Sequence, residues 1–173
     1  MSLLDVARLI RRTGRIAEPA PPAPAPEVEV APDGSAQAPV APRALRGSVQ
    51  VRHVDAGSCN GCEIEVAAAF GPVYDAERYG ARLVASPRHA DVVLVTGVVT
   101  RNMAEPLRLT VAATPEPRRV VALGDCARDC GAFRGAHGVE GAVRDVVPVD
   151  LEVPGCPPEP TAIVEALRRV TGR

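Results

Sequence analysis

Short runs of β-branched and apolar residues alternate with amphipathic stretches over most of the chain after residue 48. Such runs predict β-strands, and the later ones are almost continuously Val and Leu, as in strands that are covered on both faces of a parallel sheet. The predicted strands are Val49–Val54, Val92–Thr96, Val120–Gly124 and Val146–Val149, with a shorter fifth candidate at Arg82–Ala85.

Helical periodicity falls between and after these strands, at Glu63–Phe70, Asn102–Ala113 and Pro158–Val170. Asn102 and Glu105 have the spacing of an N-cap pair, and prolines open the last helix where their missing N–H is tolerated. Strands that alternate with helices predict an α/β fold, an open parallel sheet with flanking helices and right-handed crossovers.

The chain before this region has a different composition. Residues 1–17 carry leucines and arginines at helical spacing, which predicts a short basic amphipathic helix that either rests on a membrane surface or frays in water. Residues 18–47 contain eight prolines among Ala, Val and acidic residues, the composition of a disordered tether. One α/β domain is therefore predicted over residues 48–173.

Composition excludes several functions. A net charge of −1 gives no basic surface for nucleic acid. All 20 basic residues are arginine, so lysine-dependent phosphate loops and Schiff-base chemistry are excluded. The apolar runs are too short to span a bilayer, and Arg11 and Arg12 are not followed by the apolar stretch of an export signal. We expect a cytoplasmic protein, in which cysteines serve as metal ligands or catalytic thiols rather than in disulfides.

Four of the five cysteines come directly after predicted strands: a close pair after the first, and single residues after the third and the last, at Cys59, Cys62, Cys126 and Cys156. The carboxyl ends of parallel strands share one edge of the sheet, where ligands of open α/β folds bind. The pattern predicts that three loops bring four thiolates together.

Tetrahedral zinc and an iron–sulfur cluster both suit four thiolates. Zinc ribbons draw on two close cysteine pairs, whereas here one close pair is joined by two distant single cysteines. Glycines near each cysteine would let backbone N–H groups approach cluster sulfur. The spacing therefore favours one [4Fe–4S] cluster, with structural zinc as the alternative.

Other polar residues receive weaker predictions. Cys130 is interpreted as a small buried hydrophobe, although a ligand exchange with Cys126 is conceivable. The histidines are interpreted as solvated or hydrogen-bonded rather than ligating. Glu63 and Glu65 begin a helix, where the dipole favours carboxylates; a proton relay beside a redox centre is the alternative, stronger for Glu65.

Six motifs, in order along the chain, resemble the complex I 20 kDa subunit family, and most closely the small subunits of energy-converting [NiFe] hydrogenases and of formate hydrogenlyase. The resemblance covers about residues 49–170. The motifs are Cys59-Asn60-Gly61-Cys62-Glu63-Ile64-Glu65, Tyr74-Asp75-Ala76-Glu77-Arg78-Tyr79-Gly80, Ser86-Pro87-Arg88-His89-Ala90-Asp91, Val99-Thr100-Arg101-Asn102-Met103, Gly124-Asp125-Cys126 and Pro154-Gly155-Cys156-Pro157-Pro158.

The resemblance implies a flavodoxin-like domain without flavin that holds one [4Fe–4S] cluster beside a large catalytic subunit. It assigns the cluster to Cys59, Cys62, Cys126 and Cys156. It also implies a ferredoxin-like iron–sulfur subunit and membrane subunits as partners, at the inner face of the cell membrane. Any nickel would be held by the large subunit, and one face of this domain is expected to be buried against it.

Two departures from the family pattern matter. Complex I proper has adjacent cysteines where this chain has Cys59-x-x-Cys62, which is the hydrogenase-like spacing. Cys130 stands where relatives tend to have a glycine. The segment around Met103 matches the part of complex I that lies near the quinone cavity, so a quinone-type subunit without a nickel partner is the alternative to the hydrogenase-like one.

Overall fold

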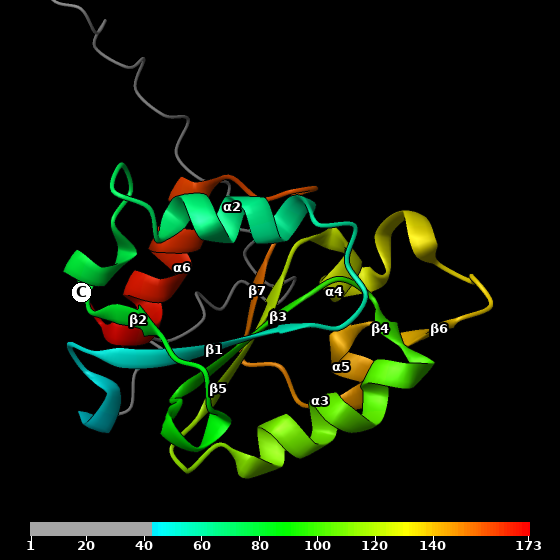
Figure 1. The fold of residues 1–173 in the computed structure, drawn as a ribbon, viewed down its shortest axis with the longest axis horizontal. Helices are drawn as coiled ribbons and strands as arrows, with labels where there is room; N and C mark the ends of the chain where they lie inside the picture. Colours follow the sequence, from blue (N-terminus) through cyan, green and yellow to red (C-terminus); the bar gives the residue numbers. More distant parts are fainter. Residues whose placement is uncertain (1–42) are drawn as a thin grey trace, which may run out of the picture.

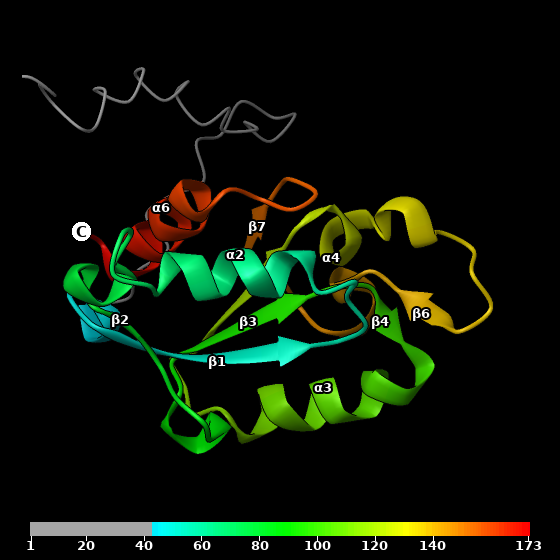
Figure 2. The ribbon, with the colours of Figure 1, turned by 45° about the horizontal axis from the view of Figure 1, so that its top comes forward.

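The computed structural model describes residues 43–173, which form two helical layers around one parallel sheet (Figures 1 and 2). The predicted N-terminal helix and most of the predicted tether lie outside the described residues. The tether was expected to reach residue 47, but Arg43–Leu45 forms a 3₁₀ turn, Leu45 is buried in the core, and the Gly47 N–H donates to Thr171 O. The packed part therefore begins earlier than the composition indicated.

The central sheet has five parallel strands in the spatial order β2-β1-β3-β5-β7. This is the flavodoxin-like order, and the direction of strand addition reverses between β1 and β3. The predicted α/β fold is therefore confirmed. The strands are β1 (Val49–Asp55), β2 (Ala81–Leu83), β3 (Val92–Thr96), β5 (Arg119–Leu123) and β7 (Leu151–Val153), and a separate antiparallel pair joins β4 (Val99–Thr100) to β6 (Val139–Gly141).

Helices cover both faces of the sheet, as the near-continuous apolar strands predict (Figure 2). Alternate residues of β3 show this division: Val92 and Leu94 pack on the side of α2 and α6, whereas Val93 and Val95 pack on the side of α3. The helices are α2 (Gly61–Ala69), α3 (Arg101–Ala113), α4 (Asp125–Asp129), α5 (Val143–Val146) and α6 (Pro160–Thr171).

The predicted strand Val146–Val149 is wrong. Val146 ends α5, and the fifth strand of the sheet is Leu151–Val153. Pro148 has no N–H to donate to a ladder, and the side chain of Val147 is buried against the α3 side of the sheet instead. The strand is aligned by Asp150, whose N–H donates to Val120 O and whose carboxylate accepts the Val120 N–H.

The predicted N-cap of α3 is also wrong, although the helix is present. α3 begins at Arg101, and its N-cap is Thr100, which is extended and donates its hydroxyl to Ala56 O. Asn102 and Glu105 are exposed on the first turns. A tertiary hydrogen bond has therefore set the start of the helix, which a local capping rule does not include.

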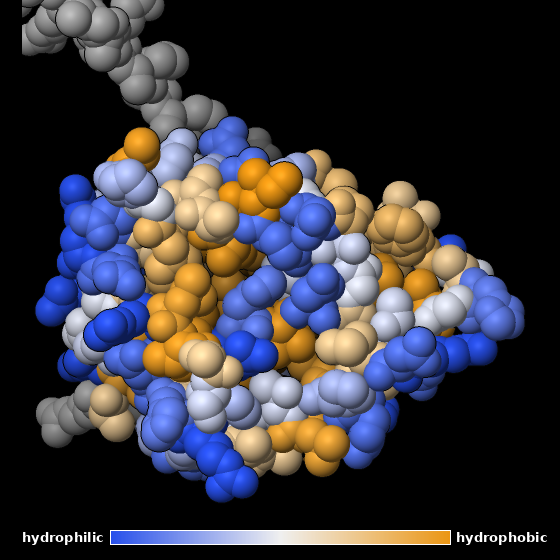
Figure 3. All heavy atoms as spheres, viewed as in Figure 1, coloured by the Kyte–Doolittle hydropathy of each residue, from blue (hydrophilic) through white to orange (hydrophobic). Residues whose placement is uncertain are grey.

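Among residues 43–173, no helix is both long and apolar enough to cross a bilayer. Figure 3 shows apolar side chains on the face between α2 and α3. Large apolar side chains that remain exposed include Ile64, which lies two residues after Cys62 on α2, and Leu109 on α3.

Candidate metal centre

The first cysteine pair lies at the junction of β1 and α2. Asp55 ends the strand, and its carboxylate accepts the N–H groups of Gly57 and Ser58, which turns the chain back over the sheet edge. Asn60 is in the left-handed region at φ 75° and serves as the N-cap of α2. Cys62, in the first turn, is buried, whereas Cys59 in the preceding loop is exposed.

Cys126 enters from the end of β5. Gly124 has φ +89°, and a Cβ placed on it would lie 2.8 Å from Cys62 Sγ. Only glycine combines this backbone conformation with this close approach. The Gly124 N–H donates to Val153 O, so the segment before Cys126 is held against β7, the strand that leads to Cys156.

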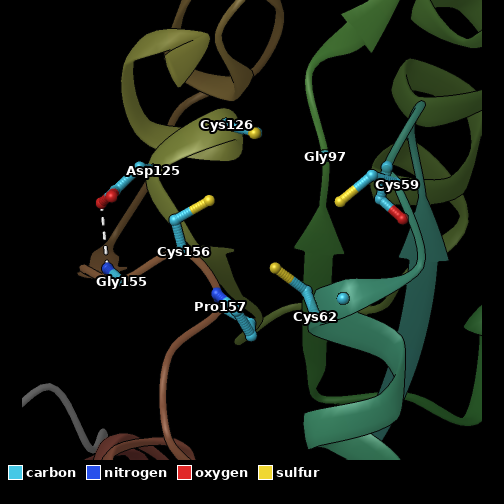
Figure 4. A pocket seen from close by; sticks show the side chains of 10 residues that line it. Cys59, Cys62, Gly97, Asp125, Cys126, Gly155, Cys156 and Pro157 are labelled. Atoms are coloured by element: carbon cyan, nitrogen blue, oxygen red, sulfur yellow. Dashed lines mark hydrogen bonds between the residues drawn. The ribbon is translucent and has the colours of Figure 1, made fainter. Parts of the chain in front are cut away.

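Cys156 lies in the proline-rich loop after β7. The Asp125 N–H donates to Gly155 O at 2.9 Å. The Asp125 carboxylate accepts the Gly155 N–H, also at 2.9 Å (Figure 4). The thiol of Cys156 is exposed, like that of Cys59. Each half of the site therefore has one buried and one exposed cysteine.

All four predicted ligands line one cavity of about 140 Å³ at the carboxyl edge of the sheet (Figure 4). The convergence that the strand order predicted is therefore present. The lining residues are Ser58, Cys59, Gly61, Cys62, Gly97, Asp125, Cys126, Gly155, Cys156 and Pro157.

The thiols perturb one another. Burial raises the pKa of Cys62 to about 12, with further contributions from Glu63 and from the other three thiols of the cavity. Burial also raises the pKa of Cys126, and the thiols of Cys156 and Cys59 add to the effect. The raised pKa values favour the protonated thiols in the absence of a bound metal. A positively charged metal centre would favour the thiolates instead, because a metal displaces thiol protons and binds the thiolates.

The donor set of the cavity, four cysteine thiols, suits a metal centre, either one zinc ion or an iron–sulfur cluster. Four thiolates on one zinc ion, with Zn–S bonds near 2.3 Å, must stand about 3.8 Å from one another. Within residues 43–173, no three His, Cys, Asp or Glu side chains are grouped closely enough to share one metal ion. Four separated thiols around a cavity match the donor set of an iron–sulfur cluster.

Glu63 is more than a residue favoured by the helix dipole. Its carboxylate accepts the hydroxyl protons of Ser58 and Thr96, and Thr96 is a fully buried polar residue at the end of β3. His53 Nε2 lies 2.9 Å from Thr96 Oγ1 and 3.7 Å from Glu63 Oε1. Glu63 thus links the loop that carries Cys59 to β3, the strand beside β1 in the sheet.

The pKa of His53 is lower than that of an ordinary histidine. Burial lowers its pKa, while the carboxylates of Glu63 and Asp55 oppose that effect and Arg52 reinforces it. Sequence reasoning did not find this network or the role of Asp125, because the partners are distant in sequence. The available signal was a carboxylate next to a cysteine in two of the three ligand loops, at Glu63 and Asp125.

The remaining candidates lie elsewhere. Cys130 is buried with Val98 and Ala142 and does not line the cavity. His89 and His137 are exposed, and Glu65 is half-buried on α2. Met103 packs against the core on the α3 side of the sheet.

A flavodoxin-like sheet with four cysteines at its carboxyl edge belongs to the class of α/β domains whose edge is suited to a metal centre. The model of the family described as NADH ubiquinone oxidoreductase, 20 Kd subunit, matches residues 59–170, and the chain belongs to that family. It is therefore an oxidoreductase subunit of an iron–sulfur-binding family, as its motifs indicated.

Two of the similar proteins have the names of hydrogenase or hydrogenlyase subunits. The chain is 48% identical over 117 residues to the "Probable membrane-bound hydrogenase subunit mbhJ" of Pyrococcus furiosus, covering 68% of this chain and 70% of that one. It is 42% identical over 128 residues to formate hydrogenlyase subunit 7 of Escherichia coli, covering 74% of this chain and half of that longer one.

Among solved structures, the chain is similar to one in the membrane-bound sulfane sulfur reductase, an archaeal respiratory membrane complex. The TM-score is 0.65 at 29% identity, over 75% of this chain and 71% of that one. The fold and the family thus agree.

Proposed function

We propose that this chain is an electron-transfer subunit that carries one [4Fe–4S] cluster on Cys59, Cys62, Cys126 and Cys156. The observation that carries the proposal is the convergence of four cysteines from three loops around one cavity at the switch-point edge of the sheet. When bound, such a cluster supplies one-electron transfer without any bond-making at the protein.

The residues of the chain prepare the cavity for this role. Cys62 and Cys126 are buried and form the floor, while Cys59 and Cys156 lie at the exposed rim. Gly124 lets the backbone approach the buried thiols. Exposed ligands at the rim place the electron entry or exit where a partner subunit can reach it, because electron transfer requires close approach of the two centres.

The complex that we propose is a membrane-associated, [NiFe]-hydrogenase-like or formate hydrogenlyase-like assembly. In it this subunit passes electrons between ferredoxin-like clusters and a large catalytic subunit, peripherally at the inner face of the cell membrane. The Cys59-x-x-Cys62 spacing and the likeness to mbhJ and formate hydrogenlyase subunit 7 support this assignment.

A second candidate is a complex I-like subunit whose large partner lacks nickel and works with quinone. The family is described as NADH ubiquinone oxidoreductase, 20 Kd subunit, and one similar solved chain belongs to a sulfane sulfur reductase. Membership alone therefore does not choose the acceptor.

The test is elemental analysis of the native complex, purified without oxygen by a tag on this chain. Iron and acid-labile sulfide in about a 1:1 ratio to each other, found together with nickel, support the hydrogenase-like function. Iron and sulfide without nickel favour the quinone-type or sulfur-reducing alternative. Zinc without labile sulfide would refute both redox functions.

A further inference from the structure

The loops that carry Cys126 and Cys156 are joined through one residue, Asp125. Cys126 and Cys156 come from different strands, and the hydrogen bonds between their loops run through Asp125 and Gly155. Asp125 uses its backbone N–H as a donor and its Oδ1 as an acceptor to the same glycine, 30 residues away. A two-way bond of this kind sets both the separation and the orientation of the loops.

The Gly155 N–H is the backbone donor through which Asp125 binds the Cys156 loop. Pro154, Pro157 and Pro158 have no N–H, so Gly155 and Cys156 carry the only backbone donors in Pro154–Pro158. Gly155 has φ +130°, and a Cβ there would lie 2.6 Å from Pro158 Cα, so the loop is closely packed around it. Its orientation therefore depends on which group accepts the Gly155 N–H, and that group is Asp125.

A chain of alternating charges holds Asp125 in turn. Arg128 Nη1 lies 3.3 Å from Asp125 Oδ1, and its Nε lies 3.5 Å from Glu152 Oε2 on β7. Arg144 Nη2 lies 3.0 Å from Glu152 Oε1, and Arg144 also donates to Arg128 O. Only 18% of the Arg128 side chain is exposed, so these pairs are less screened by solvent than ordinary surface pairs.

We propose that Asp125 is a positioning residue: its carboxylate orients the Cys156 loop toward the other three ligands, and its negative charge lowers the reduction potential of the centre. The proposal rests on the proposed function, since it concerns the centre that those ligands hold. Asp125 lines the cavity, so its charge acts on whatever occupies it. A nearby negative charge disfavours addition of an electron.

Two substitutions separate the two roles in the tagged native complex. Asp125→Asn keeps an oxygen that can accept the Gly155 N–H but removes the charge, whereas Asp125→Ala removes both. Glu105→Gln is the control for loss of one negative charge. Glu105 is exposed on α3 and forms a surface ion pair with Arg108. The readouts are iron and sulfide per chain, the electron paramagnetic resonance signal and the midpoint potential.

We expect Asp125→Asn to keep its iron and shift the midpoint potential to more positive values, with no shift in Glu105→Gln. We expect Asp125→Ala to lose a large share of its iron or to show an altered signal. An unchanged potential in Asp125→Asn, or full iron and a native signal in Asp125→Ala, would overturn the proposal.

Hydrogen exchange distinguishes this failure from failure of the proposed function. A peptide covering Pro154–Pro158 reports only the Gly155 and Cys156 amides, and we expect faster exchange in Asp125→Ala than in the wild type or Asp125→Asn. A wild-type complex without iron and sulfide would refute the proposed function alone, and the exchange rates would still decide the positioning role. Equal exchange in all three forms would overturn that role.

Discussion

Gly124 and Cys62 approach each other so closely that a Cβ on the glycine would stand 2.8 Å from the cysteine sulfur. The glycine follows β5 and is the N-cap of α4, and the cysteine lies in the first turn of α2, so this contact joins the two halves of the cavity. Since Gly124 also has φ +89°, the position excludes other residues both by space and by backbone conformation.

Substitution of this glycine should therefore damage the centre beyond its cost in stability. We expect Gly124→Ala to lower iron content strongly and to destabilise the fold by about 1–3 kcal/mol from backbone strain alone. Gly135→Ala is the matched control, because Gly135 has φ +78° but open space around its Cβ position. Iron analysis and thermal unfolding test this; equal iron in the two variants would contradict it.

Each of the four cavity cysteines should be required for the cluster. We expect Cys59→Ala, Cys62→Ala, Cys126→Ala and Cys156→Ala each to remove or alter the electron paramagnetic resonance signal of one cluster, while the signals of the ferredoxin-like clusters of the complex remain. Cys130→Ala is the control, since Cys130 is buried outside the cavity lining. A native signal in any of the first four, or loss of signal in the control, would refute this ligand set.

The buried thiol of Cys62 should be protected from alkylation after a chelator has removed the metal from the complex. Thiolate is the reactive form, and burial raises the pKa of Cys62 to about 12. Cys59 and Cys156 are exposed, so we expect iodoacetamide to label them first near neutral pH. Mass spectrometry of labelled peptides over time measures the order, and labelling of Cys62 as fast as Cys156 would argue against it.

Stability should fall on mild acidification because of His53. Burial lowers its pKa in the folded chain, so the unfolded chain binds more protons as the pH drops through the ordinary histidine value of about 6.5. Its contribution is fully present above that pH and is lost as the pH falls toward the lowered pKa. We expect His53→Asn to flatten the dependence of the unfolding midpoint on pH between about 5 and 7. His89→Asn, at an exposed position, should leave the dependence as in the wild type.

Much of the fold followed from local pattern. The runs at Val49–Val54, Val92–Thr96 and Val120–Gly124 are strands within a residue or two. The last two are apolar on both faces and have few other ways to be buried, whereas the first is marked by its β-branched residues. Cys59, Cys62, Cys126 and Cys156 could be placed at one edge before any coordinates, because the carboxyl ends of parallel strands necessarily coincide.

Tertiary structure decided what depends on distant partners. The last strand is Leu151–Val153 rather than the more apolar Val146–Val149, because Asp150 pairs with Val120 and Pro148 cannot join a ladder. The bond of Glu63 to Thr96 spans 33 residues and that of Asp125 to Gly155 spans 30. The sequence by itself determined most of the sheet and the gathering of four cysteines at its edge. The orientation of their loops was decided only when the chain brought separate segments within hydrogen-bonding distance, which no local pattern encodes.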